Sequence, residues 1–279
     1  MKVEDLNTKT TPHWCPGCGD YGVLNALKTA LVELNIERQN VVLVSGVGCA
    51  SKIPQWVNVF GFHTLHGRLL PVATGVKIAN KDLTVIAAGG DGDSLGIGLG
   101  HFVHSCRRNI DLTTIIFDNK VYGLTTGQTS PTSDKGFVSK STPFGSIENP
   151  VNPVSLAIAS GASFVARGFA GDVKHLTGLI VEGVKHKGFS VIDVLQPCVS
   201  FNHVNTYDFY SQRVYKIEET SDRFEAFRKS FEWGVKIPVG VFFREERETL
   251  VDQMPQLKGE ALSKRSLNVD LKNLFERFT

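Results

Sequence analysis

The sequence predicts an α/β fold, in which a doubly wound parallel sheet carries helices on both faces. Short, continuously apolar runs alternate with longer segments of helical periodicity, as in sheets that are buried on both sides. Glycine-rich or polar turns follow several of these runs, where ligands bind in such folds. The 279 residues suffice for one large α/β domain or two small ones.

The first half of the chain alternates regularly between the two kinds of segment. Leucines spaced three or four residues apart predict a helix over residues 21–34, and the β-rich run that follows predicts a strand over 41–44. The next predicted elements are a helix over 67–80, a strand over 83–88, a helix over 95–107 and a strand over 113–117.

A second round of alternation follows a long loop. Its predicted elements are a helix over 154–160, a strand over 163–166, a helix over 172–186 and a strand over 189–195. Asp172 is the expected N-cap of the last helix, and Gly188 its C-terminal stop. The loop over 125–153 is rich in Gly, Ser, Thr and Pro, and its length indicates a functional segment such as an active-site cover.

The pattern weakens beyond Cys198. An aromatic arm, a charged helix and one more strand around 239–243 are expected there, with Pro238 at the start of that strand. We therefore expect an N-terminal segment with a CxxC pair over 1–20 and an α/β domain over 21–198. A C-terminal extension over 199–279 would pack on a partner or on the core.

Composition narrows the classes of function. A net charge of +2 gives no global signature of nucleic-acid binding, and no apolar run reaches the ~20 residues of a membrane helix. The first fourteen residues lack the apolar core of a signal peptide, so we expect a cytoplasmic protein. Thiols stay reduced in that compartment, so the five cysteines favour metal ligands or buried positions over disulfides.

A glycine-rich turn over 89–94 joins a predicted strand to a predicted helix. Its glycines allow close approach of a phosphate, and the helix N-terminus supplies amide donors. Asp91 would repel that phosphate unless a cation such as Mg²⁺ lies between them. Asn119 ends the next predicted strand, and the Val121 carbonyl is available as a third oxygen. In the alternative interpretation the turn has no ligand and Asp91 only caps the helix.

Four cysteines stand at positions that can converge on one side of the sheet. Cys15 and Cys18 precede the first helix, Cys49 follows the first strand, and Cys198 follows the last strand of the domain. Four thiolates suit a [4Fe–4S] cluster or a structural zinc. The presence of only one close pair favours the cluster. Cys106, within a predicted helix, is interpreted as a core residue.

The chain resembles the β subunits of 2-oxoacid:ferredoxin oxidoreductases. The resemblance rests on four segments, which read WCPGCG at 14–19, HTLHGR at 63–68, GDGD at 90–93 and DNKVYGLT at 118–125. It covers about 14–198, continues weakly into the tail, and is closest to the short β subunits of archaeal 2-oxoacid and 2-oxoglutarate enzymes. It implies a thiamine diphosphate-binding fold.

The resemblance also implies a set of ligands. Thiolates that would hold a [4Fe–4S] cluster are Cys15, Cys18, Cys49 and Cys198. Oxygen donors that would hold Mg²⁺ are Asp91, Asn119 and the Val121 carbonyl. Residues that would surround thiamine diphosphate are Val47, Gly48, Cys49, Ala50, His66, Gly92, Asp93, Gly123 and Leu124. His66 has the alternative of being a hydrogen-bonded residue without a cofactor contact.

Lys52 would lie near the reacting centre. We expect it to bind the substrate carboxylate or to stabilise developing charge, the alternative being a surface lysine.

The activity implied by the resemblance is the coenzyme A-dependent oxidative decarboxylation of 2-oxoacids. Electrons would pass through the cluster to ferredoxin. The carboxylate that activates the cofactor's pyrimidine ring would come from a larger α subunit, or a fused γα subunit. The roughly eighty residues after the first domain are too few for a second domain of the usual ~100–150 residues. We therefore expect an obligate complex, as a dimer of heterodimers.

Two other functions remain open from the sequence. One is a non-oxidative thiamine diphosphate-dependent decarboxylase or synthase subunit, which would not need a cluster. The other is a zinc-stabilised subunit without catalysis, against which the pairing of Asp91 with Asn119 argues. The preferred 2-oxoacid, the cluster potential, the ferredoxin docking site and the roles of residues 128–152 and of the tail do not follow from the sequence.

Overall fold

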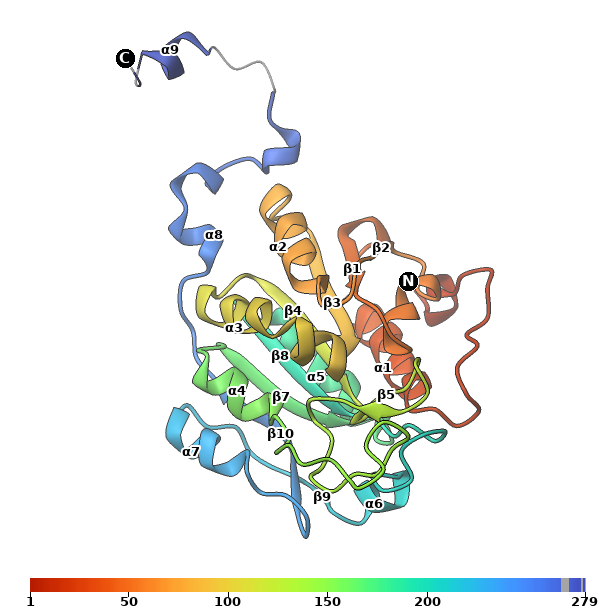
Figure 1. Ribbon diagram of the computed structural model, residues 1–279. Helices are drawn as coiled ribbons and strands as arrows, with labels where there is room; N and C mark the ends of the chain where they lie inside the picture. The colour runs from red at the N-terminus through yellow and green to blue at the C-terminus, as the bar shows by residue number, and fades with distance from the viewer. Residues whose placement is uncertain (267–270, 277, 279) are drawn as a thin grey trace.

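The computed structural model describes residues 1–266, 271–276 and 278. In this part of the chain eight strands form one sheet in the order β2-β1-β3-β4-β8-β7-β10-β9, and β5 and β6 form a separate hairpin (Figure 1). The strands are β1 (Val41–Ser45), β2 (Phe60–His63), β3 (Thr84–Gly90), β4 (Leu112–Asp118), β5 (Val121–Tyr122), β6 (Gln128–Thr129), β7 (Phe164–Phe169), β8 (Phe189–Leu195), β9 (Val214–Lys216) and β10 (Ile237–Arg244).

Helices cover both faces of the sheet. The helices of the described residues are α1 (Asp20–Glu33), α2 (Leu69–Ala79), α3 (Leu99–Arg108), α4 (Pro153–Ala159), α5 (Val173–Lys185), α6 (Tyr207–Ser211), α7 (Arg223–Lys229), α8 (Leu250–Gln253) and α9 (Lys272–Phe275). One apolar cluster joins α1 and α5 to the sheet, and a second joins α2, α3 and α4 to it from the other side. None of the described helices is long and apolar enough to span a bilayer.

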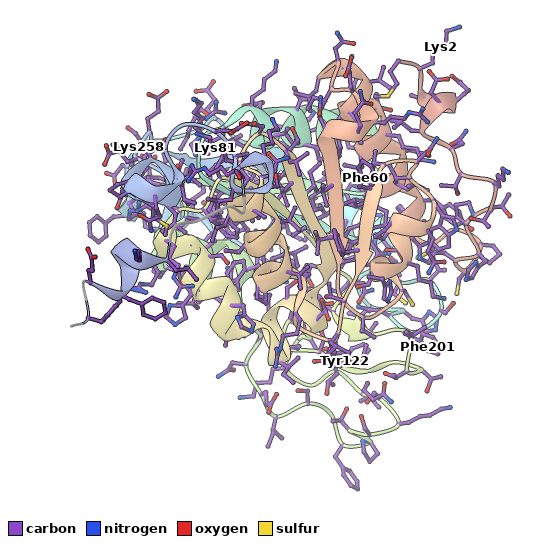
Figure 2. The ribbon with its side chains drawn as sticks, turned by 90° about the horizontal axis from the view of Figure 1, so that it is seen from above. Lys2, Phe60, Lys81, Tyr122, Phe201 and Lys258 are labelled. Atoms are coloured by element: carbon purple, nitrogen blue, oxygen red, sulfur yellow. The ribbon has the colours of Figure 1, made fainter. Side chains whose placement is uncertain are left out.

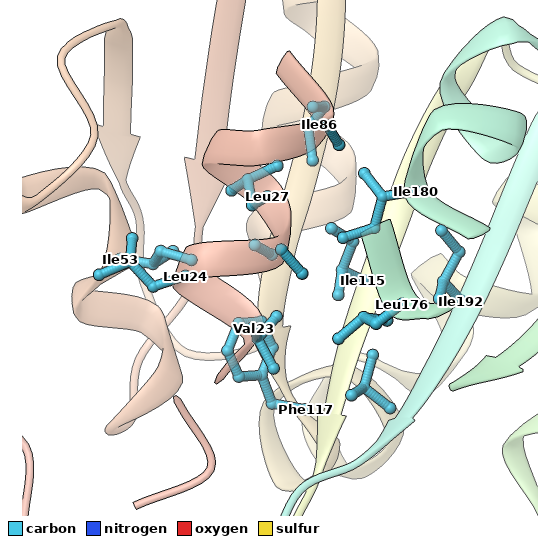
Figure 3. Close-up of a cluster of buried hydrophobic side chains, with 14 of the residues drawn as sticks. Val23, Leu24, Leu27, Ile53, Ile86, Ile115, Phe117, Leu176, Ile180 and Ile192 are labelled. Atoms are coloured by element: carbon cyan, nitrogen blue, oxygen red, sulfur yellow. The ribbon is translucent and has the colours of Figure 1, made fainter. Parts of the chain in front are cut away.

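The two apolar layers explain why the central strands read as continuous hydrophobic runs. Every residue of β1, β4, β7 and β8 is buried, since side chains on both faces of the sheet meet a helix. Figure 3 shows Leu27 of α1 and Leu176 of α5 in the cluster that includes Ile115 of β4. Cys106 packs in the opposite layer with no exposed surface, which confirms its interpretation as a core residue.

Most predicted elements are confirmed. The strands expected at 41–44, 83–88, 113–117, 163–166 and 189–195 are β1, β3, β4, β7 and β8, and the helices expected at 21–34, 67–80, 154–160 and 172–186 are α1, α2, α4 and α5. Asp172 caps α5 as predicted, because its side chain accepts a hydrogen bond of 3.1 Å from the His175 amide.

The helix expected over 95–107 begins differently. Residues 93–97 form an irregular turn, Gly96 has a non-helical ψ of −110°, and regular helix starts only at Leu99. The neighbours of this turn explain the break. A Cβ on Gly96 would lie 2.6 Å from the Tyr122 hydroxyl, and one on Gly98 would lie 2.4 Å from the Asp93 carbonyl. The glycines therefore let the chain pass close to Tyr122 and to the Asp93 carbonyl of its own turn before the helix begins.

The sheet is mixed at one edge. β2, β1, β3, β4, β8 and β7 are parallel, whereas β10 pairs antiparallel with β7 and carries β9 parallel to itself. The strand expected around 239–243 is therefore present but reversed, and Pro238 is its second residue. Two strands of the expected C-terminal extension thus join the sheet. The part of that extension at 267–270, 277 and 279 lies outside the described residues.

Candidate active site at the carboxyl ends of the strands

Four neighbouring parallel strands deliver the expected ligand residues to one edge of the sheet. Asp91 directly follows β3 and Asn119 directly follows β4, and these strands pair up to Gly90 and Phe117. Cys49 lies in the segment after β1, and Cys198 in the segment after β8. Because the chain leaves each strand at the same edge, residues up to 149 positions apart in the sequence come together.

A cavity of about 200 Å³ opens at this edge. Its walls include each of the nine residues expected around thiamine diphosphate and the three expected Mg²⁺ ligands. Gly90, Tyr122 and Thr125 also line it. Figure 2 shows Tyr122 and Phe201 on one side of the molecule, and Lys81 and Lys258 on the opposite side. The sequence-derived set therefore shares one cavity, while the individual roles remain predictions.

Asp91 is the buried carboxylate at the base of this cavity. Ser130 and Thr132 each donate a hydroxyl hydrogen bond of 2.5 Å to Asp91 Oδ2. Burial raises the pKa of Asp91, and the two hydroxyls and the Gly92 amide oppose that shift because they stabilise the ionised form. A buried carboxylate that keeps hydrogen-bond donors on one oxygen suits an ionised metal ligand.

Thr132 also links Asp91 to a second buried carboxyl. Its hydroxyl oxygen lies 2.6 Å from Asp118 Oδ1 as well as 2.5 Å from Asp91 Oδ2. A hydroxyl has one proton, so one of the two carboxyls must supply the other. Burial raises the pKa of Asp118 to about 8, with a further contribution from the charges of Asp193 and Asp91 that Lys120 opposes. The shared Thr132 hydroxyl therefore couples the protonation of Asp118 to that of Asp91.

Asp93 connects three segments of the cavity wall. Its Oδ1 accepts hydrogen bonds from the amides of Val47, at 3.0 Å, and Gly67, at 2.7 Å, and lies 2.8 Å from His66 Nδ1. Gly46 has no side chain because the carboxylate occupies that space: a Cβ there would lie 1.8 Å from Asp93 Oδ2. The observed contacts of Asp93 are thus with the protein, and they hold the walls of the cavity in place.

The segments that carry the expected cluster cysteines contact one another. Trp14 donates a 2.8 Å hydrogen bond to the Cys49 carbonyl, which joins the CxxC segment to the turn after β1. Gln196 Nε2 lies 3.4 Å from Cys18 Sγ, which joins the same segment to the end of β8. A Cβ on Gly123 would lie 3.6 Å from the sulfur of Cys49 and 3.7 Å from that of Cys198.

The electrostatics of these thiols fit a cationic group. Burial, together with the neighbouring Asp20 and Cys198, raises the pKa of Cys49 to about 11. Burial likewise raises the pKa values of Cys18 and Cys198. Thiols in such surroundings ionise only if a bound metal supplies positive charge, and coordinating thiols are then deprotonated. The residues present therefore fit a metal cluster.

A metal ion could also be held by acidic, histidine or cysteine side chains that lie close together. In residues 1–266, 271–276 and 278, no three such side chains form a group that could hold a metal ion. The expected Mg²⁺ set contains only one carboxylate, with an amide and a backbone oxygen. The expected cluster spreads four thiolates around several irons.

Lys52 is close in sequence to residues of the cavity wall. It follows Cys49 and Ala50 in the short 3-10 turn Ala50–Gln55, and it is not one of the cavity-lining residues. Its Nζ lies 3.4 Å from His13 Nε2. Its expected role therefore remains a prediction.

Several residues of the site are not in the sequence-derived set. Ser130 and Thr132 lie within residues 128–152, where no residue could be assigned from the sequence. Asn202 donates a 3.0 Å hydrogen bond to the Asn119 carbonyl and so supports the second expected Mg²⁺ ligand. The three hydroxyl residues within 130–133 are the sequence feature that could have indicated hydrogen bonding in this loop. Their partner Asp91 could not be identified from it, because it is distant in the sequence.

The fold and cavity define a class of protein, and family models agree with it. A model described as "Thiamine pyrophosphate enzyme, C-terminal TPP binding domain" matches residues 41–194. These residues hold the parallel strands from β1 to β8, the glycine-rich turn and the cavity, so the chain is a subunit of a thiamine diphosphate-dependent enzyme. A second model, which describes the C-terminal part of the pyruvate ferredoxin oxidoreductase beta subunit, matches residues 198–259.

The chain belongs to the β-subunit family of the 2-oxoacid:ferredoxin oxidoreductases, as its sequence motifs implied. It is 51% identical over 249 residues to a 2-oxoacid:ferredoxin oxidoreductase subunit beta from Sulfolobus sp, covering 84% of this chain and 82% of that one. It is 37% identical over 254 residues to a 2-oxoglutarate synthase subunit from Archaeoglobus fulgidus, covering 91% and 92%.

A solved structure extends the comparison to three dimensions. It is the 2-oxoglutarate:ferredoxin oxidoreductase from Magnetococcus marinus with 2-oxoglutarate, coenzyme A and succinyl-CoA bound. The superposition has a TM-score of 0.93 at 37% identity and covers 100% of this chain and 96% of that one. The mixed sheet and its helical layers are thus those of the family.

Proposed function

We propose that this β subunit, together with an α subunit, carries out the coenzyme A-dependent oxidative decarboxylation of 2-oxoacids, with electrons leaving through a [4Fe–4S] cluster to ferredoxin. The observation that carries the proposal is the position of Cys49. It lines the cavity, and its sulfur shares the Gly123 neighbourhood with that of Cys198. A cluster on these thiolates would therefore lie directly beside the cofactor.

This chain's part in the reaction is to bind and orient. Asp91, Asn119 and the Val121 carbonyl would hold Mg²⁺, and the amides of the turn at 90–93 would face the diphosphate. Thiamine diphosphate, when bound, supplies the carbanion that attacks the 2-keto carbon and the electron sink for loss of CO₂. Asp93 keeps the segments at 47 and 66–67 in place around the ring system.

An α subunit would complete the site. The carboxylate that activates the pyrimidine ring is expected from that partner, and large apolar side chains are exposed near cavity-lining residues of this chain. Leu65 is 78% exposed and Ile97 59%, and the cavity residue Leu124 is half exposed. Such a patch supports burial by another protein surface. We also place the enzyme in the cytoplasm, where thiols remain available for a cluster.

The substrate is proposed to be 2-oxoglutarate, pyruvate or both. Relatives named for 2-oxoacids in general and relatives named for 2-oxoglutarate both match over most of this chain. The test is anaerobic co-purification with the α subunit, then assay of coenzyme A-dependent ferredoxin reduction with each acid. Reduction is expected, with the ratio giving the preference. A complex with zinc but no iron, or turnover by this chain alone, would contradict the proposal.

Lys52 is proposed to act on the substrate side of the cavity, through its positive charge near the wall formed by Cys49 and Ala50. Removing one such electrostatic contact typically costs 10²–10³-fold in rate, so Lys52→Ala should lower kcat/KM about 100-fold. Lys258→Ala, an exposed lysine on the other side of the molecule, is the control (Figure 2). Full turnover by Lys52→Ala would remove Lys52 from the mechanism.

A further inference from the structure

The long loop returns to the strand ends through a short segment of hydroxyl residues. Ser130, Thr132 and Ser133 are each at least nine-tenths buried, although serine and threonine are mostly surface residues. A turn closes the segment, in which the Ser133 amide donates to the Ser130 carbonyl and the Ser130 amide donates to Ser133 Oγ. The hydroxyls therefore point into the protein, where their hydrogen-bond partners lie.

The first partner of this segment is the Asp91 side chain. Both Ser130 and Thr132 donate to Oδ2, at 2.5 Å each, so neither hydroxyl occupies Oδ1. The terminal torsion of an aspartate is soft, and the carboxylate plane needs outside contacts to select one orientation. Two donors on a single oxygen provide that selection and leave the other oxygen available.

The second partner is the stretch that carries the other expected metal ligands. Ser133 Oγ donates a 2.5 Å hydrogen bond to the carbonyl of Lys120, between Asn119 and Val121. Lys120 returns the contact, because its Nζ donates to the Thr132 carbonyl at 2.8 Å and lies 3.2 Å from Asp134. Lys120 has a positive φ of 60°, a strained conformation for a lysine that these contacts help to hold.

We propose that Ser130 and Thr132 are positioning residues that set the Mg²⁺ affinity of the site, by fixing the Asp91 carboxylate relative to the loop that carries Asn119 and Val121. The segment at 130–133 contacts Asp91, which follows β3, and the carbonyl of Lys120, which lies between Asn119 and Val121 after β4. It therefore connects the ends of two neighbouring strands. This inference rests on the metal site put forward under the proposed function.

Three variants distinguish an effect on the orientation of the Asp91 carboxylate from an effect on folding. Ser130→Ala removes one donor on Asp91 and leaves Thr132 in place, Thr132→Val removes a hydroxyl at nearly constant shape, and Thr132→Ser keeps it. Ser141→Ala, an exposed hydroxyl in the same loop whose contact is to Ser139, is the matched control. Losing a hydrogen-bond partner of a metal ligand typically lowers metal affinity 10–100-fold.

The measurement is a Mn²⁺ titration, read by electron paramagnetic resonance, of the metal-free αβ complex with thiamine diphosphate present. We expect the Mn²⁺ dissociation constant to rise about 10–100-fold in Ser130→Ala and Thr132→Val. It should stay near wild type in Thr132→Ser and Ser141→Ala. The Mg²⁺ concentration for half-maximal activity should rise in parallel, while kcat at saturating Mg²⁺ is largely recovered.

The outcomes are distinguishable. Unchanged Mn²⁺ affinity in Ser130→Ala overturns the inference, and that variant decides the matter if Thr132→Val does not fold. Equal loss in Thr132→Ser and Thr132→Val would also overturn it, because the hydroxyl would then not be the cause. Failure of the wild-type complex to bind Mn²⁺ together with thiamine diphosphate would instead refute the proposed function.

Discussion

At the scale of single residues, buried polar side chains around the cavity hold segments of chain together. Asp93 is the clearest case, because one carboxylate oxygen receives two backbone amides from different loops. Its position depends in turn on Gly46, where no side chain can be accommodated. The geometry of the cofactor cavity therefore depends on a glycine that would not itself touch the cofactor's phosphates.

Gly46→Ala should weaken thiamine diphosphate binding by displacing Asp93. Overpacking of this kind typically costs about 1–3 kcal/mol of unfolding free energy, and we expect at least a tenfold rise in the cofactor's dissociation constant. Calorimetric titration of the αβ complex measures this.

The control for that substitution is Gly75→Ala in α2. No atom lies within 4 Å of a Cβ built there. An alanine in a helix interior should stabilise the protein by about 0.5–1 kcal/mol. Equal cofactor affinity in the two variants would contradict the account of Gly46.

At the scale of elements, capping side chains mark the starts of two helices. α5 begins at Asp172, whose side chain caps the His175 amide, and α4 begins at Asn152, which accepts from the amides of Val154 and Ser155. Both caps follow ordinary sequence preferences. The start of α3 does not, because tertiary contacts of Gly96 and Gly98 override the helical periodicity there.

Asp172→Ala should lower the unfolding free energy by about 1 kcal/mol through loss of the cap. Partial burial acts to raise the pKa of Asp172, but the His175 amide and Lys216 lower it overall. The carboxylate's contribution is therefore full above its unfolded pKa of about 4 and is lost as the pH falls through its lower folded value. Urea unfolding of both proteins at pH 7 and pH 3 measures the difference.

Lys216→Ala separates the cap from the ion pair. It removes the exposed 3.3 Å contact with Asp172 and keeps the hydrogen bond to the His175 amide. Exposed pairs contribute about 0–1 kcal/mol, so this variant should lose less than Asp172→Ala. An equal loss would show that the ion pair, rather than the cap, stabilises the start of α5.

At the scale of the whole molecule, the C-terminal region covers one edge of the parallel sheet. β10 pairs with β7 in the antiparallel direction and is itself almost entirely buried. Without it, the apolar strand β7 would be an unpaired edge, which favours aggregation. Residues after Cys198 are thus part of the folded body, whatever they also contact in the enzyme complex.

A chain ended after Cys198 should therefore be insoluble when co-expressed with the α subunit, since it lacks β9 and β10. A chain ended after Ser266 keeps every described strand of the sheet and should remain soluble. Soluble yield and size-exclusion profile measure both. A soluble, cofactor-binding protein from the shorter chain would contradict the assignment of β10 to the fold.

The sequence by itself determined the alternation of elements and the buried strands, because these depend on apolar periodicity. The residues around the cavity were implied by the resemblance of four motifs to a known family. Asp91 and Asn119 could be paired in advance, since neighbouring parallel strands end at one edge. The reversed direction of β10, the exposed edge strand β2 and the break at Gly96 were decided only by the tertiary structure. So were the hydroxyl bonds of Ser130 and Thr132 to Asp91. Each of these features depends on contacts between residues that are far apart in the sequence. Local sequence patterns do not show which distant residues will be close in space.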